Sequence, residues 1–511
     1  MDKLKKILIG VILIIAAVLL YAYLAYPAEY VNRVLRWGDA DVYDYQKFPE
    51  RKIEASDSPY IFPINSDEER VRTQFELAPD MDDFDSFLAD NRTQAFIVIQ
   101  NDEILYEKYF NGAERESIVT SFSTAKSFTS TLIGIAIDEG HIHSVDDPIT
   151  DYLPELLERD PAFVNITIRN LLMMSSGIKY KEFPFVNGDD AKTYYYHDLR
   201  KLALEETYIA GQPEEIFLYN NYHPLLLGMV IERATGTSVA NYLQEKVWQP
   251  MGAEYAASWS LDEAGFEKME SGINGRAIDF AKFGQLFLHN GSKLGATIVP
   301  SAWVAESTQV DSSVDYENYY YDDFIFANGQ GYYKYMWWGI QRDAENYDFM
   351  ALGNHGQFIY VSPQSNLVIV RFGESYGEFG GAEGWVNLFY DFASAAQSRA
   401  LNVENTFLKP FISLAEEATC AETRNRLYLI DGQYVFHSTE GWCSDAGYSH
   451  TLYGTSPQER FCYLEDSFVG PLSSCEPALN ELFNTILENL DKPDLGLGEE
   501  HSVEIIFEMQ P

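Results

Sequence analysis

The N-terminus carries the feature that most limits how this chain can fold. Three lysines among the first six residues precede the run ILIGVILIIAAVLLYAYLAY, Ile7 to Tyr26, which contains no charged residue. A helix of about 20 apolar residues is long enough to cross a bilayer. Tyrosines gather near its far end, where aromatic rings favour the membrane interface. Because the lysines should stay in the cytoplasm, the sequence predicts a membrane anchor at residues 1–27 with everything after Pro27 outside.

A cleaved signal peptide is the alternative for the same segment. Its apolar part would be shorter and would end in small residues of the A-x-A kind. Here tyrosines and Pro27 follow instead. We therefore expect an uncleaved, single-pass anchor that holds a periplasmic or otherwise extracytoplasmic domain.

Size and charge exclude some classes of protein. The chain has 511 residues, of which 46% are hydrophobic and 15% aromatic, and these values are typical of folded globular proteins. Its formal net charge is -42. Nucleic-acid phosphates would be repelled by this charge, so nucleic acid is not an expected partner.

The cysteines lie close together near the C-terminus. Cys420, Cys443, Cys462 and Cys475 are the only cysteines of the chain. In an extracytoplasmic setting they suggest two disulfides, with three connectivities open. A zinc site is less favoured because no C-x-x-C pair occurs, and free thiols remain the alternative if the compartment is reducing.

The order of secondary-structure signals predicts an α+β fold, an antiparallel sheet flanked by helices in an α/β sandwich with an inserted helical lobe. AFIVIQNDEILYEKYFNG, residues 95–112, indicates a β-hairpin that turns at Asn101-Asp102. A helix-rich stretch follows, and strand signals return from residue 335. We expect a linker at 28–85, the main domain at 86–400 and a small cysteine-containing C-terminal extension at 401–511.

The segment SFSTAKSFTS contains a candidate catalytic pair at the start of a predicted helix. Ser123 and Lys126 are spaced i and i+3, so their side chains project from the same side of a helix. A lysine that burial keeps neutral can take the serine proton. The unpaired N–H groups of a helix N-terminus can stabilise an oxyanion. Alone, the spacing is also typical of an ordinary polar first turn.

Two further motifs accompany this pair. Tyr219-Asn220-Asn221 precedes an apolar helix, and Asn354-His355-Gly356-Gln357 begins a predicted strand. With S-x-x-K, Y-x-N and a strand motif in this order, residues 96–396 resemble the serine β-lactamase and penicillin-binding-protein superfamily. Within it, the chain is most similar to β-lactamase-related esterases and 6-aminohexanoate-dimer hydrolases.

The resemblance implies a serine hydrolase that forms a covalent acyl-enzyme. It implies that Ser123 is the nucleophile, Lys126 its base, and Tyr219 the group that protonates the leaving group. A phenol has an ordinary pKa near 10, so we expect Lys126 to lie close enough to favour its anion. By the same resemblance, Asn221 would hold Lys126 or the substrate.

Further roles come from the strand motif. The N–H groups of Ser123 and Gln357, the residue after Gly356, would form the oxyanion hole, and His355 would face the cleft or pack against the strand. No cofactor or metal is implied.

The third motif departs from the family pattern because it lacks the leading lysine that attracts a substrate carboxylate. We therefore expect a small neutral or cationic ester or amide as substrate. A D-alanyl-D-alanine carboxypeptidase or a β-lactamase remains an alternative enzyme. A non-catalytic ligand-binding or sensor ectodomain is the alternative outside enzymes. The oligomeric state is not indicated by the sequence.

Overall fold

The structure is a computed structural model of the chain. It describes residues 2–78, 81–182, 187–313, 316 and 330–407, together with strand backbone at 410–414, 421–430, 433–442, 447–456, 459–464, 467–471 and 503–507. Side chains are described between residues 5 and 396. Two compact units are present, Met1–Ala393 and Ser394–Pro511.

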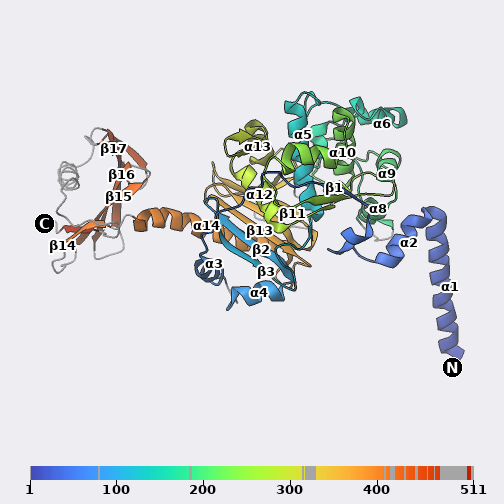
Figure 1. The fold of residues 1–511 in the computed structure, drawn as a ribbon, viewed down its shortest axis with the longest axis horizontal. Helices are drawn as coiled ribbons and strands as arrows, with labels where there is room; N and C mark the ends of the chain where they lie inside the picture. Colours follow the sequence, from blue (N-terminus) through green and yellow to red (C-terminus); the bar gives the residue numbers. More distant parts are fainter. Residues whose placement is uncertain are drawn as a thin grey trace. The chain divides into compact units, whose positions relative to one another are not determined.

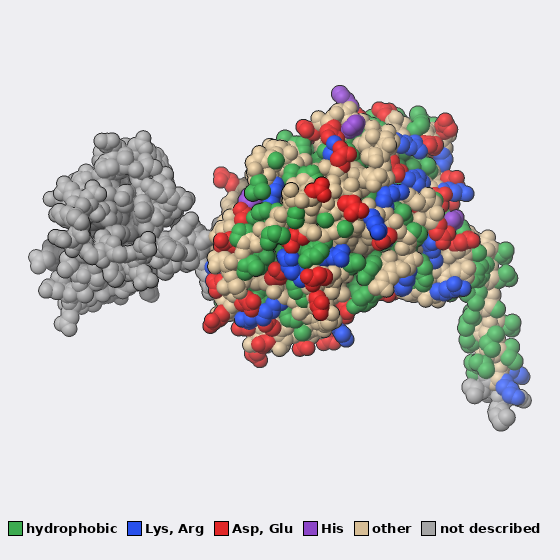
Figure 2. All heavy atoms as spheres, in the orientation of Figure 1, with side chains coloured by type: hydrophobic (Ala, Val, Ile, Leu, Met, Phe, Trp, Pro, Cys, Tyr) green, Lys and Arg blue, Asp and Glu red, His purple; other side chains and the backbone are tan. Residues whose placement is uncertain are grey.

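The first unit begins with the apolar helix α1 (Asp2–Ala25), whose segment Lys5–Ala25 has a mean hydropathy of 2.9 and is long enough to cross a membrane. Its hydrophobic side chains are exposed, as Figure 2 shows. After Pro27, α2 (Ala28–Trp37) packs against α8 (Asp189–Tyr195). The two helices share an apolar cluster that includes Tyr30, Val34 and Tyr195.

A seven-stranded antiparallel sheet forms the centre of this unit (Figure 1). Its strand order is β3-β2-β13-β12-β11-β10-β9. The hairpin predicted at Asn101-Asp102 is confirmed, because both residues have positive φ angles and join β2 to β3. The strand bounds are β2 (Thr93–Gln100), β3 (Glu103–Tyr109), β9 (Gly331–Lys334), β10 (Trp337–Gln341), β11 (Tyr347–Gly353), β12 (Gln357–Ser362) and β13 (Leu367–Gly373).

Helices cover both faces of the sheet. Successive residues of a strand point to opposite faces, so neighbouring residues of β12 contact different helices. In β12, Ile359 lies against Gly284 of α12 (Ala277–Leu288), where a Cβ on the glycine would come within 2.8 Å of it. The neighbouring residue Phe358 instead packs against Phe389 of α14 (Gly381–Phe407), with ring centroids 5.4 Å apart. The predicted sandwich of helices on an antiparallel sheet is therefore confirmed.

A helical lobe adjoins one side of the sandwich. It comprises α6 (Pro154–Arg159), α7 (Ile168–Leu172), α8, α9 (Leu199–Glu205), α10 (Tyr222–Thr235) and α11 (Val239–Leu243). A small sheet of order β1-β5-β6-β4 lies beside it. Its strands are β1 (Glu50–Ile53), β4 (Val119–Thr120), β5 (Ala257–Ser260) and β6 (Ile273–Gly275).

The segment expected to be a linker, residues 28–85, forms part of the compact unit. Besides α2, it contains η1 (Asp44–Lys47), β1, α3 (Glu68–Phe75) and the start of α4 (Phe84–Asp90). β1 pairs with β5 in antiparallel register, and Phe75 stacks on Phe392 of α14 at 4.2 Å between ring centroids. These contacts are long-range, which is why no local period in the sequence indicated them.

The second unit contains a seven-stranded sheet of order β14-β20-β15-β16-β17-β18-β19. Its strands are β14 (Pro410–Leu414), β15 (Ala421–Ile430), β16 (Gln433–Trp442), β17 (Gly447–Ser456), β18 (Glu459–Leu464), β19 (Ser467–Pro471) and β20 (Val503–Phe507). Cys462 lies in β18, but its side chain is not among those described. Cys420, Cys443 and Cys475 lie outside the described residues, and the predicted disulfides therefore stay a prediction.

Candidate active site

Ser123 lies at the junction between β4 of the small sheet and helix α5 (Ala125–Asp138). It belongs to η2 (Phe122–Thr124), directly before α5, as the sequence predicted. Ser121 ties this turn to β6, because its Oγ accepts a hydrogen bond from the N–H of Ile273 at 3.0 Å. Within residues 121–130, Ser123 alone is not fully buried. The fold thus presents one hydroxyl of this segment to its surroundings.

Lys126 contacts Ser123 directly. Its Nζ lies 2.8 Å from Ser123 Oγ and 2.9 Å from the carbonyl oxygen of Glu270. The side chain is only 1% exposed, and burial lowers the pKa of Lys126 to about 7, against the opposing influence of Glu270 and Asp190. Much of the lysine is therefore neutral near pH 7, with a lone pair that can accept the serine proton.

Tyr219 completes a three-residue cluster. Lys126 Nζ lies 4.8 Å from the centroid of its ring, and its phenol interacts with Ser123. Tyr333 and Trp338 pack on the ring. Burial raises the pKa of Tyr219 more than the interaction with Ser123 lowers it. We expected Lys126 to favour the anion, but the structure favours a protonated phenol beside a neutral amine.

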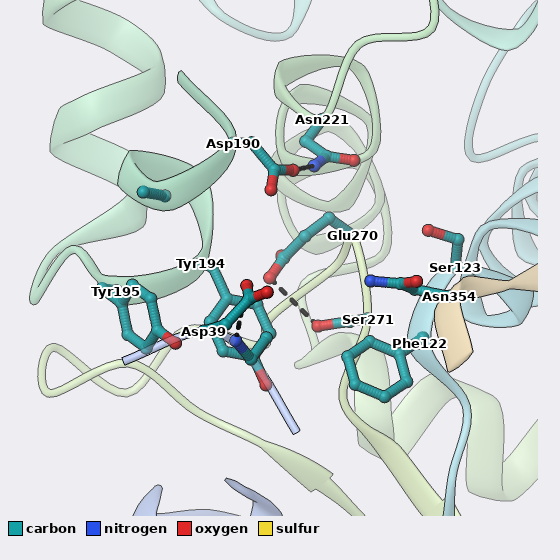
Figure 3. Close-up of a pocket in the computed structure, with 12 residues that line it drawn as sticks. Asp39, Phe122, Ser123, Asp190, Tyr194, Tyr195, Asn221, Glu270, Ser271 and Asn354 are labelled. Carbon is teal, nitrogen blue, oxygen red and sulfur yellow. Dashed lines mark hydrogen bonds between the residues drawn. The ribbon is translucent and has the colours of Figure 1, made fainter. Parts of the chain in front are cut away.

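Asn221 lies on the other side of the pocket. Its Nδ2 donates to Asp190 Oδ1 at 3.0 Å (Figure 3) and also to the Tyr180 hydroxyl at 2.9 Å. No hydrogen bond to Lys126 is found among the described residues, whereas Asn221 Oδ1 is buried without a partner there. Of the two roles expected for Asn221, contact with a substrate N–H group is the one its geometry leaves open.

The third motif follows β11, which ends at Gly353, and consists of the turn η7 (Asn354–Gly356) and the first residue of β12, Gln357. Gly353 lies against the turn that contains Ser123: a Cβ on it would come within 2.6 Å of Ser121 O and 3.0 Å of Ser123 N. Asn354, the next residue, lines the pocket together with Ser123. The local signal for this contact was the glycine at 353, which allows the strand to approach the serine backbone closely.

The motif residues named from the sequence have other contacts. His355 Nε2 lies 2.9 Å from the carbonyl oxygen of Ala40, so this nitrogen carries the proton, and the ring packs on Phe122. The Gln357 amide bonds Gly373 across the sheet at 2.7 Å. Gly356 has φ +80°, and any Cβ there would strike the guanidinium of Arg371. The structure thus brings Ser123, Lys126 and Tyr219 together and bonds the side chains of His355 and Gln357 elsewhere.

A small open pocket of about 70 Å³ lies in front of Ser123 (Figure 3). Its lining is acidic, with carboxylates from Asp39, Asp190 and Glu270 and no lysine or arginine among the lining residues that the structure describes. Glu270 is 3% exposed and pairs with the buried Lys268 at 2.9 Å. None of these three acids was singled out from the sequence, because they come from distant segments. Among the described side chains, no group of three His, Cys, Asp or Glu could hold a metal ion.

The pH dependence of activity should follow Lys126. For a neutral ester, kcat/KM should rise with pH and reach half of its maximum near pH 7, where the pKa of Lys126 lies. We expect kcat/KM to rise with pH because only the neutral amine of Lys126 can take the serine proton, and the neutral fraction grows as pH rises. Initial rates between pH 5 and 9 measure this. A rate that falls through pH 7 would contradict the role of a neutral Lys126.

Comparison with known proteins agrees with this geometry. The sequence model of the family described as Beta-lactamase matches residues 84–386. The 6-aminohexanoate-dimer hydrolase of Paenarthrobacter ureafaciens is 28% identical over 310 residues, which cover 58% of this chain and 76% of the relative. The teichoic acid D-alanine hydrolase of Staphylococcus aureus is 28% identical over 146 residues, but only 28% of this chain and 33% of that protein are aligned.

Solved structures show the same fold. A candidate 6-aminohexanoate-dimer hydrolase from Bacillus anthracis superposes with a TM-score of 0.59 and 26% identity, covering 71% of this chain and 95% of the other. The family match spans more than half of the chain and includes Ser123, Lys126 and Tyr219. The chain therefore belongs to the beta-lactamase family, whose members include hydrolases of amides and esters.

Proposed function

We propose that this protein is a membrane-anchored, extracytoplasmic serine hydrolase that cleaves a small ester or amide through a covalent acyl-enzyme. The observation that carries the proposal is the contact between Ser123 Oγ and a buried Lys126 whose pKa lies at about 7. Burying an ionisable lysine costs folding free energy, so a buried lysine with a lowered pKa beside a serine hydroxyl favours a catalytic role. The cluster includes Tyr219, whose ring centroid lies 4.8 Å from Lys126 Nζ.

The chemistry follows from this arrangement. Lys126 removes the proton of Ser123 as its Oγ attacks the substrate carbonyl carbon, which forms a tetrahedral intermediate. The bond between this carbon and the leaving group then breaks, Tyr219 gives its proton to the departing nitrogen or oxygen, and the protonated Lys126 returns a proton to Tyr219. In the second half, water gives a proton to the Lys126–Tyr219 pair as it attacks the acyl carbon, the bond to Ser123 Oγ breaks, and that proton passes to Ser123 as the acid product leaves.

The oxyanion is assigned to backbone donors. The N–H of Ser123 lies in the turn η2, directly before α5, and Gly353 brings the end of β11 against it. The second donor expected from the family pattern belongs to the third motif, for which we named Gln357. Asn354 is the member of this motif that lines the pocket, so its N–H is a second candidate for the same role.

The pocket lining indicates a neutral or cationic substrate. A substrate carboxylate, as in β-lactams or D-alanyl-D-alanine peptides, would meet acidic side chains and no lysine or arginine among the described lining residues. This favours a neutral or amine-bearing ester or amide over the carboxypeptidase and β-lactamase alternatives.

Location is inferred from α1. Its exposed apolar surface and its length support a bilayer-spanning helix with the catalytic unit outside. The hydroxyl of Tyr23 donates to Asn32 Oδ1 of α2 at 2.9 Å, so α1 is tied to the helix that follows it. A helix retained in this way is consistent with an anchor that is not removed.

Covalent labelling tests the proposal. Incubating the full chain with a fluorophosphonate should add one phosphonyl group to the peptide that contains Ser123, as detected by mass spectrometry. Heat-denatured protein should not be labelled, because neither Lys126 nor the oxyanion donors are then in place. Absence of both an adduct and turnover over a panel of neutral esters and amides would favour the sensor alternative.

A further inference from the structure

The pocket in front of Ser123 has a wall that comes from the segment after α1. Asp39 and Ala40 line it, although they lie more than 80 residues before Ser123 in the chain. They directly follow α2, which ends at Trp37, and Gly38 reverses the chain with φ +72° and ψ −138°. Only glycine adopts this backbone conformation without strain. The turn therefore brings Asp39 to the pocket at the end of a helix.

Contacts on both sides hold Asp39 in this position. Tyr195 of α8 donates its hydroxyl to the carbonyl oxygen of Gly38 at 2.9 Å. On the other side, His355 Nε2 donates to the carbonyl oxygen of Ala40 at 2.9 Å. Asp39 thus lies between the carbonyl groups of Gly38 and Ala40, the first bonded to the helical lobe and the second to the third motif. Its carboxylate remains exposed and forms no ion pair among the described residues.

The other acidic groups of the pocket differ in their partners. Glu270 Oε1 accepts from Lys268, but its buried Oε2 has no hydrogen-bond partner among the described side chains. Asp190 accepts from Asn221 and Tyr180 and has no cation within ion-pair distance in the described part of the chain. Lys268 thus offsets one of the three negative charges. Two carboxylates and a buried acceptor remain for a ligand that donates hydrogen bonds and carries positive charge.

We propose that Asp39, supplied by the segment that follows the N-terminal apolar helix, is a specificity-determining residue that binds a protonated amine of the substrate in this pocket. The amine donates to Asp39 and Asp190, and Glu270 Oε2 accepts from it or from a neighbouring N–H. This inference rests on the proposed hydrolysis at Ser123. It adds that the segment linking the apolar helix to the catalytic fold is part of the substrate site.

Competitive inhibition tests the inference without knowledge of the natural substrate. In full-length protein hydrolysing a neutral p-nitrophenyl ester, butylammonium should inhibit at lower concentration than butanol of the same chain length. Asp39→Asn should raise the inhibition constant of butylammonium roughly threefold to fivefold, as expected for an exposed charge pair. The effect should shrink at 1 M salt, where exposed charges are screened.

A matched variant separates local from general electrostatics. Glu29→Gln removes one negative charge from the first turn of α2, in the same segment but outside the pocket lining. It should leave the inhibition constant of butylammonium unchanged. Fluorophosphonate labelling of Ser123 in both variants reports whether the catalytic fold is intact. Equal effects of the two substitutions would show a long-range field and would overturn the proposed contact.

The outcomes distinguish this inference from the proposed function. If the wild type hydrolyses neutral esters but binds butylammonium no better than butanol, the amine site is wrong and the hydrolase stands. If Asp39→Asn leaves butylammonium inhibition unchanged, Asp39 is not its ligand. If the wild type is neither labelled nor active, the proposed function fails and this inference fails with it.

Discussion

Ser123→Ala should abolish fluorophosphonate labelling and lower kcat/KM for a neutral ester by roughly 10⁴-fold or more. The reason is that the alanine methyl group cannot form the acyl bond, whereas the pocket, Lys126 and Tyr219 stay in place. Ser123 is partly exposed at the pocket, so loss of its hydroxyl leaves no large cavity. Initial rates with purified full-length protein and intact-mass spectra measure the two effects.

Ser130→Ala is the matched control. Ser130 lies on the same helix α5, it is buried, and its Oγ has no hydrogen-bond partner in the described part of the chain. Removing this hydroxyl should change neither labelling nor rate, and the variant reports on any general effect of altering the helix. If Ser123→Ala keeps wild-type turnover, another residue is the nucleophile and the mechanism above is wrong.

Lys126→Met should lower kcat/KM by roughly 10³-fold, within the range expected for loss of a general base. Methionine has a similar length and fills the space around it without an ionisable group. Burial disfavours the charged form of the Lys126 amine. The free energy of unfolding of Lys126→Met should therefore stay within about 1 kcal/mol of the wild-type value or exceed it. The residual rate should lose the rise near pH 7, because the group responsible for that rise is absent.

Lys293→Met provides the control for this pH dependence. Burial also lowers the pKa of Lys293 to about 7, but its ammonium group lies over the ring of Tyr60 and bonds Gln285, away from Ser123. This variant should keep both the rate and its rise near pH 7. Should that rise vanish in Lys293→Met and persist in Lys126→Met, the assignment of the base would be reversed. Chemical denaturation of both variants checks that the comparison is made on folded protein.

The parts of the site that the sequence indicated are local or follow a family pattern. Ser123 and Lys126 lie within one helical turn, so their spacing alone places them on the same side of α5. Tyr219 lies far away in the chain, and it was identified only because its motif and the flanking residues resemble those of a known family. The sandwich was predictable because the alternation of strand residues and the hairpin turn are local signals as well.

The third motif was located from the sequence, but its contacts were not. Whether Asn354, His355 or Gln357 faces the nucleophile depends on where β11 ends and how the turn before β12 is built. A shift of one residue in a strand exchanges the two faces. In the structure Asn354 lines the pocket, His355 holds Ala40, and the Gln357 side chain bonds Gly373.

By itself, then, the sequence determined the apolar N-terminal helix, the antiparallel sheet with its covering helices, and the spacing that places Ser123 beside Lys126. These features depend on hydrophobic period, turn residues and spacing within a few residues. The acidic pocket was decided only by tertiary structure, since Asp39, Asp190 and Glu270 come from three separate segments. Each is an ordinary surface acid in the sequence, and only the packing of α2 on α8 and the turn at Gly38 bring Asp39 beside the others.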